Sequence, residues 1–368
     1  MSGGFKESAV NRRMFLLGLG ATACGARPVK TKPRRPVKPN PEKRVGQEVP
    51  LVSWYDTQTQ RSPVAIRGDL LVLAAETELW TWDARTMKRV DGYVLPSRHC
   101  CFVQDGSLAV FGLRSDSGHS VIHRIDATGI RETLPGEVFG AFDHYPTQVL
   151  PARSADQLYV TKDKDVYLMR EVNGRMEDAA VVAIPNRNSS NRGQLFSLGD
   201  GRLVAPGGGV NILQAGKPAV TYPMPERPLV HMVAATNDRL WYSHTTKHYL
   251  AADVLVLAKL ATPMVEEQRI QFAPARVVHL ASSGRAVAAL LFAVREGSSA
   301  LEPIREWTVV VIDDNGTERW RAVVPKEFTP GMVTLNQVGF LAMSEHRVVL
   351  FGERPPIAWD VATGAPIG

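Results

Sequence analysis

A repeated pattern of short apolar runs separated by turns restricts this chain to a β-rich fold. The last copy, residues 357–364, is an apolar, β-prone run that ends in Asp and is followed by a turn of small residues. Variants of this phrase recur from residue 79 onward, and no stretch keeps a helical period of 3.6 residues over three turns. Short apolar runs bounded by Gly, Asp and Asn are typical of strands. The pattern predicts an all-β chain.

Alignment of the apolar runs shows seven repeated units. A second strand of each unit is predicted at residues 69–73, 106–111, 157–160, 201–204, 238–242, 284–288 and 346–351. A third strand, ending in a polar turn, is predicted at residues 79–83, 121–126, 166–171, 210–214, 254–257, 309–313 and 357–360. A period of about 40–50 residues matches propeller blades of four strands. We therefore predict a seven-bladed β-propeller of four-stranded antiparallel blades over residues 50–368, with six or eight blades as the alternatives. A β-sandwich or two stacked domains explain the even repeat less well.

The two ends of this region are predicted to meet in one sheet. The final unit stops shortly after its third strand, whereas residues 51–55 (Leu-Val-Ser-Trp-Tyr) form an apolar run ahead of the first complete unit. This N-terminal strand can supply the missing outer strand of the last blade. We expect it to close the ring.

The positive charge of the chain is confined to its N-terminal tail. Residues 1–48 contain eleven Lys or Arg and three acidic residues, and the remaining chain contains 32 basic and 34 acidic residues. A nearly neutral body offers no basic face for phosphate groups. We therefore expect no nucleic-acid partner.

Residues 1–24 have the composition of a cleavable export signal. The paired Arg12 and Arg13 precede a short uncharged run that begins with Met14 and Phe15. About ten apolar residues are too few to span a bilayer permanently, which takes about twenty. Two arginines followed by Met-Phe-Leu resemble the twin-arginine signal. Asn11 and Leu17 depart from the usual pattern, so the general secretion route remains the alternative.

The signal ends in Ala21-Thr22-Ala23-Cys24-Gly25, which resembles a bacterial lipobox. In that reading Cys24 is the lipidated first residue of the mature chain. The usual Leu three residues before the cysteine is Ala21 here. Ala21-Thr22-Ala23 also fits ordinary A-x-A cleavage, which would leave Cys24 unmodified. The sequence favours lipidation, and with it a location in the periplasm, at the outer membrane or at the cell surface.

Residues 25–49 are rich in Pro, Lys and Arg and contain almost no apolar side chains to bury. Such a segment is expected to be a disordered, extended tether. Behind a lipid anchor it would hold the domain away from the membrane, and its charge would attract anionic head groups.

Two phrases in the repeats carry a family resemblance. Residues 311–320 (Val-Ile-Asp-Asp-Asn-Gly-Thr-Glu-Arg-Trp) resemble the repeat of the PQQ-like propellers, and residues 359–364 (Trp-Asp-Val-Ala-Thr-Gly) are similar to that repeat and to WD40 units. The Asp-turn is clear in four units and is lost at Gln214 and Ala258. Among lipid-anchored envelope propellers, the chain is also similar to the scaffold of outer-membrane-protein assembly, a family with eight blades. The resemblance implies a ring of antiparallel sheets, a fold that hosts both scaffolds and enzymes.

The adjacent Cys100 and Cys101 invite comparison with quinoprotein alcohol dehydrogenases, which carry an adjacent-cysteine disulfide beside the quinone. Those enzymes are much longer and have a calcium site. Here the pair lies in an apolar run, where strand alternation points one thiol into the packing. Free cysteines are usually small buried hydrophobic residues. We therefore predict no quinone site and no cofactor.

No other set of residues forms a recognisable catalytic or metal-binding motif. His119 with His123, and His244 with His248, are spaced for a helical metal site but lie in strand and turn contexts, where the two side chains would be about 13 Å apart. Residues 163–165 and 313–316 lack the spacing and the glutamate of a calcium loop and fit hairpin turns. The Gly207-Gly208-Gly209 run does not precede a helix, so it is no phosphate-binding loop.

The longest interruptions of the repeat are residues 138–147 and 298–306, and both are expected on one rim of the ring. The first combines aromatic and polar side chains suited to a contact surface, namely Phe139, Phe142, His144 and Tyr145. Packing of this loop on its own blade is the alternative. The sequence thus favours a monomeric, lipid-anchored, non-catalytic binding or scaffold propeller of the bacterial envelope with a protein partner. The alternative is an exported propeller enzyme, either a quinone-dependent dehydrogenase or a hydrolase or lyase.

Overall fold

The computed structural model describes residues 64–113, 120–135, 146–162, 165–182, 184, 195–206, 209–214, 216–223, 229–244, 252–293, 306–326, 340–351 and 356–367. All of these residues lie within one compact unit. Every named element among them is a β-strand. Among the described residues, no helix is long and apolar enough to cross a membrane.

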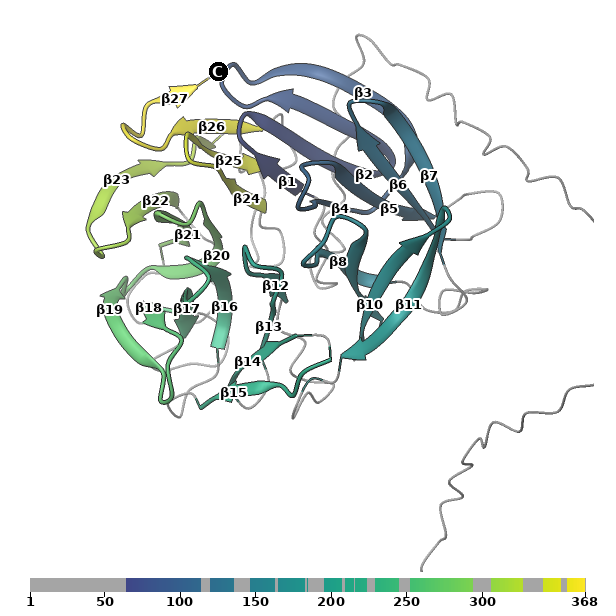
Figure 1. Cartoon of the computed structure of the whole chain (residues 1–368). Helices are drawn as coiled ribbons and strands as arrows, with labels where there is room; N and C mark the ends of the chain where they lie inside the picture. The colour runs from purple at the N-terminus through teal and green to yellow at the C-terminus, as the bar shows by residue number, and fades with distance from the viewer. Residues whose placement is uncertain are drawn as a thin grey trace, which may run out of the picture. The chain divides into compact units, whose positions relative to one another are not determined.

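The strands form seven antiparallel blades that follow one another around a ring (Figure 1). Blades 1 to 3 consist of β1 (Val64–Arg67), β2 (Leu70–Asp83), β3 (Lys88–Ser97); β4 (His99–Phe102), β5 (Leu108–Leu113), β6 (Ser120–Asp126), β7 (Gly129–Pro135); and β8 (Pro146–Pro151), β9 (Gln157–Lys162), β10 (Asp165–Val172), β11 (Arg175–Val182). Blades 4 and 5 consist of β12 (Phe196–Ser197), β13 (Leu203–Pro206), β14 (Val210–Leu213), β15 (Val220–Tyr222); and β16 (Leu229–Ala234), β17 (Arg239–His244), β18 (Val254–Lys259), β19 (Val265–Gln271). Blades 6 and 7 consist of β20 (Arg276–Ser282), β21 (Ala286–Phe292), β22 (Trp307–Asp313), β23 (Glu318–Val323); and β24 (Phe340–Met343), β25 (Arg347–Phe351), β26 (Ile357–Asp360), β27 (Pro366–Ile367).

Blade 1 also has four strands, because β2 folds back on itself. Its first residues pair with β1 and its later ones with β3. An extended strand of 14 residues would be about 46 Å long. Yet the residues flanking it meet, because Ala84 N donates a hydrogen bond to Asp69 O at 2.7 Å. The predicted second and third strands of this unit are therefore the two arms of a hairpin.

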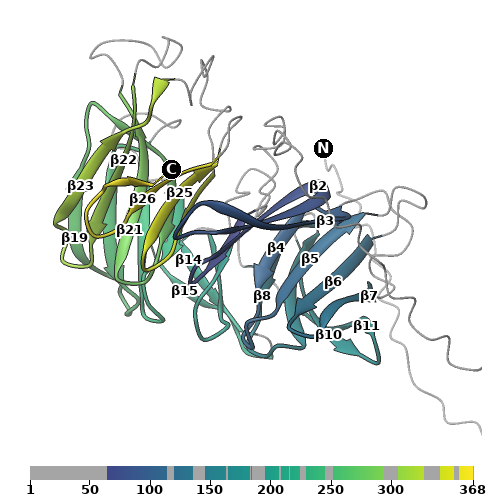
Figure 2. The same ribbon diagram turned by 90° about the horizontal axis from the view of Figure 1, so that it is seen from above.

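Seven hydrophobic clusters lie between successive blades and close the ring. Each cluster draws side chains from two neighbouring blades, and the last joins Trp82 of blade 1 to Phe351 of blade 7. The first strands of neighbouring blades also contact each other in order, including β24 with β1. The predicted seven-bladed propeller is confirmed. Seen from above, the blades stand side by side (Figure 2).

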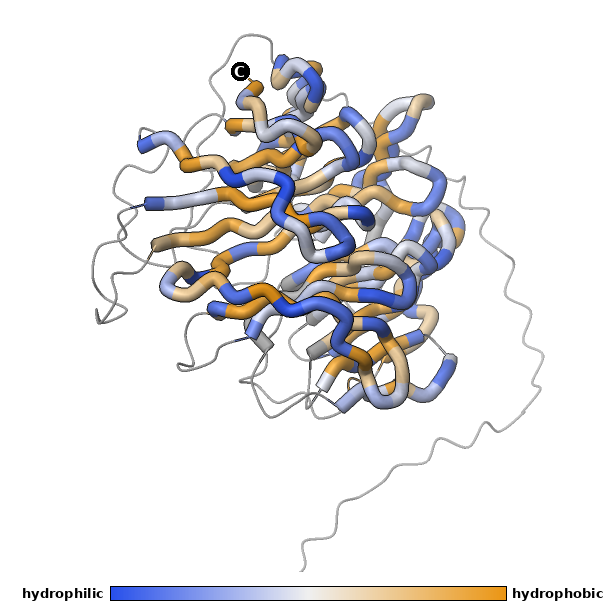
Figure 3. Tube along the Cα trace, turned by 90° about the vertical axis from the view of Figure 1, so that its left-hand side faces the viewer, coloured by the Kyte–Doolittle hydropathy of each residue, from blue (hydrophilic) through white to orange (hydrophobic). Residues whose placement is uncertain are grey.

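The continuous apolar runs of the sequence follow from burial of both faces of each blade. In β22, Val309 and Val311 pack in the cluster between blades 6 and 7, whereas Val310 and Ile312 pack between blades 5 and 6. Alternate side chains of a strand point to opposite faces, so a sheet covered on both sides needs apolar residues throughout. Hydropathy along the chain shows apolar strands joined by polar turns (Figure 3).

The last blade differs from the sequence-based expectation. Its fourth strand is β27, in which Pro366 and Ile367 pair with Trp359 and Ala358 of β26. The prediction that the final unit lacks its fourth strand is therefore wrong. Two residues after the turn are enough to pair with β26 and form that strand. Residues 51–55, predicted to close the ring, lie outside the described residues.

Blades 2 and 3 are joined at their outer strands. The end of β7 pairs in parallel with the start of β11, through Leu134 with Arg175 and Pro135 with Met176. The two blades thereby form one eight-stranded sheet.

Candidate interaction surface

The two rims of the ring are built from different connections. In a blade of four antiparallel strands, the turns from first to second and from third to fourth strand lie on one rim, here called the turn rim. The connections from second to third strand and from blade to blade lie on the other, the connection rim. Every connection of more than six residues between successive strands joins strand ends on the connection rim. The turns of the turn rim are two to six residues long.

Contacts between neighbouring blades hold the turn rim together near its inner strands. Arg67 of blade 1 donates a hydrogen bond to Val103 O of blade 2 at 2.9 Å. The amide of Gln104 in the next turn donates to Ala152 O of blade 3 at 3.3 Å and to Gly199 O of blade 4 at 3.4 Å. One side chain thus connects three blades.

Blades 3 to 5 continue these contacts. Arg202 of blade 4 donates to Asn237 O of blade 5 at 2.5 Å. Gly201 has φ +78°, and a Cβ there would lie 2.4 Å from the Cα of Arg153 in blade 3. Only glycine permits both this backbone conformation and this approach. The turn rim is therefore a closely packed, fixed surface.

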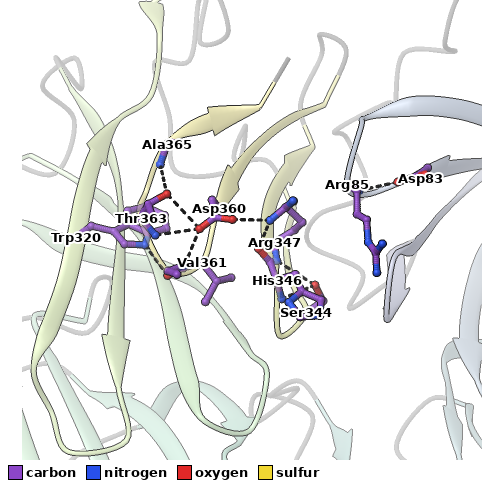
Figure 4. Close-up of polar contacts among 11 residues, drawn as sticks. Asp83, Arg85, Trp320, Ser344, His346, Arg347, Asp360, Val361, Thr363 and Ala365 are labelled. Carbon is purple, nitrogen blue, oxygen red and sulfur yellow. Dashed lines mark hydrogen bonds and ion pairs between the residues drawn. The ribbon is translucent and has the colours of Figure 1, made fainter.

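The Asp that ends the third strand shapes the turn that follows (Figure 4). In blade 7, Asp360 Oδ1 accepts hydrogen bonds from the backbone N–H groups of Ala362 and Thr363, both at 3.0 Å, and from the Thr363 hydroxyl. Its other oxygen pairs with Arg347 at 2.6 Å. Asp83 and Asp313 accept turn N–H groups in the same way. The repeated phrase is a structural device for a tight turn.

These contacts also fix the charge of Asp360. Partial burial would raise the pKa of its carboxyl, but the hydrogen bonds from Thr363 and Ala362 and the charge of Arg347 together lower it below its ordinary value. The carboxylate form is the one that holds the turn.

The predicted contact loop cannot be placed. Phe139, Phe142, His144 and Tyr145 lie outside the described residues, as do Arg12, Arg13, Phe15 and Cys24 of the export signal. Both long interruptions, residues 138–147 and 298–306, nevertheless attach to the connection rim, because the first joins β7 to β8 and the second joins β21 to β22.

Both cysteines of β4 are buried, on opposite faces. Cys100 packs in the cluster between blades 1 and 2 and Cys101 in the cluster between blades 2 and 3. They form no disulfide. Burial raises the pKa of the Cys101 thiol to about 12 and that of Cys100 further. A protonated thiol is a poor nucleophile and a poor metal ligand, so burial on opposite faces disfavours both roles for this pair.

The histidine pairs and acidic loops of the sequence are described only in part. His123 is buried in β6, and His244 ends β17 with its Nε2 3.4 Å from an Arg269 nitrogen, whereas His119 and His248 lie outside the described residues. Among the described residues, no group of three or more His, Cys, Asp or Glu side chains could hold a metal ion. The Asp313 loop is a hairpin turn, as predicted.

Comparison with known proteins identifies the fold. No protein-family model matches the sequence, and no curated protein matches it. Many solved structures do. A chain in the crystal structure of the Mitotic Checkpoint Complex is similar over 93% of this chain and 99% of that chain, with 14% identity and a TM-score of 0.56.

Two further solved structures agree. The Cps50 (Swd1) beta-propeller domain of Myceliophteria thermophila matches 82% of this chain and 97% of its own length, with 14% identity and a TM-score of 0.55. Hsv2 of Kluyveromyces lactis matches 81% of this chain and 93% of its own, with 9% identity and a TM-score of 0.51. These likenesses show a WD40-like seven-bladed propeller, and identities this low show the fold alone.

Proposed function

We propose that this chain is a non-catalytic binding or scaffold module whose connection rim recognises a protein. One observation carries the proposal, namely that the two rims differ. The turn rim is fixed by contacts such as that of Gln104 with blades 3 and 4, while every long connection leaves from the opposite rim. Binding residues tend to lie on loops carried by a rigid scaffold.

The relatives in structure support a role in assembly. One of them is a chain of a complex named for the mitotic checkpoint, so a propeller of this shape serves there inside a multi-protein assembly.

We further propose that the module is exported and displayed at the bacterial cell envelope by a lipid on Cys24. Support comes from the sequence, in which Arg12, Arg13 and Phe15 open the signal and a basic, Pro-rich tether follows the cysteine. The tether would give the second attachment that a lipid chain needs for stable anchoring.

The contact face can be tested by crosslinking and pull-down from envelope preparations. Replacing Phe139, Phe142 and Tyr145 by Ser is expected to remove the captured protein, because aromatic side chains dominate protein interfaces. A matched control replaces Arg85, Thr86 and Lys88 on the turn rim by Ser and should leave capture unchanged. If only the turn-rim variant loses the captured protein, recognition lies on the turn rim and the proposal is wrong.

The anchor is tested separately by Cys24→Ala. The variant is expected to leave the membrane fraction while keeping its fold. If the processed variant stays in the membrane, lipidation of Cys24 is wrong, and the binding proposal is unaffected.

A further inference from the structure

Met87 has a backbone conformation that is unusual for its residue type. Among the described residues, two that are not glycine have a positive φ, namely Met87 and Asn173, both at +52°. Asn173 forms a two-residue hairpin turn with Gly174, where asparagine is common. A long apolar side chain is rare in the left-handed region, and its backbone is strained there. Strain that persists in a fold is a reason to ask what the side chain does.

The turn that contains Met87 has the same hydrogen bonds as the turn of blade 7. Asp83 accepts hydrogen bonds from the backbone N–H groups two and three positions on, at 2.7 and 3.2 Å, and the Thr86 hydroxyl accepts one at 3.3 Å. Asp360 starts the same series, with distances of 3.0, 3.0 and 3.3 Å. By this match Met87 takes the place of Gly364, whose φ is +70°. Glycine would avoid the strain, yet blade 1 has methionine.

The neighbouring outer strands account for this exchange. In blade 6, the Trp320 ring leaves no room for a Cβ on Gly364 of blade 7. Ile367 is the equivalent of Trp320 in blade 7, because each pairs with the residue two positions before the turn Asp of its blade. Ile367 and Met87 both pack against the cluster that joins blades 7 and 1. A large outer side chain and a glycine at one seam between blades are thus replaced by a smaller side chain and a methionine at the next.

Few outer-strand residues support the seam between blades 7 and 1. The outer strand β27 has two residues, whereas β23 at the preceding seam has six. The side chain of Met87 adds apolar surface to the cluster at this seam, and burial of apolar surface stabilises the folded state. The packing of Met87 therefore offsets the strain of its backbone.

The exposure of Met87 also distinguishes it from other methionines. Met87 and Met264 are partly exposed, whereas Met169, Met176 and Met343 are buried. Oxidation of a methionine to the sulfoxide converts a flexible apolar side chain into a polar one and disrupts apolar packing. A partly exposed methionine that closes a seam is thus a place where an oxidant can change the stability of the ring.

We propose that Met87 is an oxidation site whose conversion to the sulfoxide weakens the seam between blades 7 and 1. A peroxide transfers one oxygen atom to the sulfur: the O–O bond breaks, the S–O bond of the sulfoxide forms, the thioether loses two electrons and hydrogen peroxide is reduced to water. The polar sulfoxide then leaves the apolar cluster, so the strain of the Met87 backbone is no longer offset. This effect does not depend on whether the connection rim binds a protein.

Treatment of the folded full chain with hydrogen peroxide, followed by peptide mass spectrometry and thermal unfolding, tests the proposal. Met87 is expected to gain one oxygen atom before the buried Met169 and Met176 do, and the Tm should fall by roughly 2–4 °C as Met87 is converted. Met87→Leu keeps an apolar side chain without the sulfur. Its Tm should be the same before and after peroxide.

The matched control is Met264→Leu. Met264 is partly exposed too, but it packs against the cluster between blades 4 and 5 and has no positive φ. Peroxide should lower the Tm of this variant as much as that of the parent chain. The proposal is wrong if Met87 stays unoxidised in the folded protein, or if its oxidation leaves the Tm unchanged. An equal loss of Tm in Met87→Leu and the parent would assign the effect to another methionine and would also overturn it.

Discussion

The indole Nε1 of Trp320 donates a hydrogen bond to the carbonyl oxygen of Val361 at 2.8 Å (Figure 4). Trp320 lies in the outer strand of blade 6, and Val361 lies in the turn after the third strand of blade 7. A Cβ added to Gly364 would lie only 2.8 Å from the Cγ and Cδ2 atoms of the same Trp320 ring. One side chain thus fixes the turn of the next blade by a hydrogen bond and by close packing.

Gly364→Ala is therefore expected to destabilise the protein more than a glycine turn substitution without such a neighbour. Gly364 has φ +70°, where an L residue costs about 1–2 kcal/mol, and the methyl group would also displace the Trp320 ring. Gly174→Ala is the control, because φ is +77° there and nothing lies within 4 Å of the added Cβ. Urea unfolding should show a larger loss for Gly364→Ala. Equal losses would mean that the Trp320 contact adds nothing.

The seam between blades 7 and 1 should depend on aromatic packing. Among the described residues, no strand of blade 1 is shared with blade 7, because each blade takes its strands from one continuous stretch of chain. The packing of side chains therefore holds blades 7 and 1 together. The Trp82 ring lies 5.8 Å from that of Phe351 and 6.5 Å from that of Trp80. Trp82→Ala is expected to cost about 3–5 kcal/mol in unfolding free energy.

A suitable control for the seam is Val90→Ala in the outer strand β3, where the side chain is 55% exposed. It should change stability by less than about 0.5 kcal/mol. If Trp82→Ala costs no more than this control, another part of the chain closes the ring.

Cys100 and Cys101 should be unreactive toward thiol reagents until the protein unfolds. Their burial raises both pKa values, that of Cys101 to about 12, so the thiolate is absent near neutral pH. The chain has three cysteines, and a Cys24→Ala background leaves only this pair. DTNB titration should give no reaction in buffer and two thiols in denaturant. Fast reaction of the native protein, or a disulfide between the two, would contradict their placement on opposite faces.

The Asp360–Arg347 pair should make stability depend on acid pH. The folded state lowers the pKa of Asp360 below the unfolded value of about 3.9. The folded state then binds fewer protons, so the contribution is present above the unfolded pKa and is lost as pH falls through the lowered folded pKa. Asp360→Asn keeps the turn acceptor and removes the charge. The difference in unfolding free energy from the parent, about 1 kcal/mol near neutral pH, should shrink toward pH 3.

A double-mutant cycle with Arg347→Met isolates this pair. In the Arg347→Met background, Asp360→Asn should cost less and its pH dependence should weaken. An unchanged cost would assign the effect to the turn rather than to the ion pair.

Much of the fold could be predicted because it depends on local sequence patterns, namely apolar runs and the turn residues that follow them. The second and third strands lie where the apolar runs predicted them, and the Asp-turn is a contact between Asp360 and residues two and three positions on. The sequence also showed that the fourth and fifth units lack this Asp, since Gln214 and Ala258 stand in its place. Strand order alone was also enough to predict that the two long interruptions of the repeat attach to the same rim.

What the sequence could not show depends on contacts between distant segments. Strand alternation predicted burial of one cysteine, but both are buried, because each blade is covered on both faces. The two-residue strand β27 carries no strand pattern of its own and exists because β26 offers an open edge. The bridge of Gln104 to blades 3 and 4 has no local signal, since an exposed Gln in a turn is ordinary.

The repeat by itself therefore determined the all-β class and the turn chemistry, because both depend on residues a few positions apart, and its period favoured seven blades over six or eight. The joining of blades 2 and 3 and the contacts that fix the turn rim were decided only by the tertiary structure. They arise where side chains far apart in sequence meet in space, and whether such groups find partners there depends on the packing of whole blades.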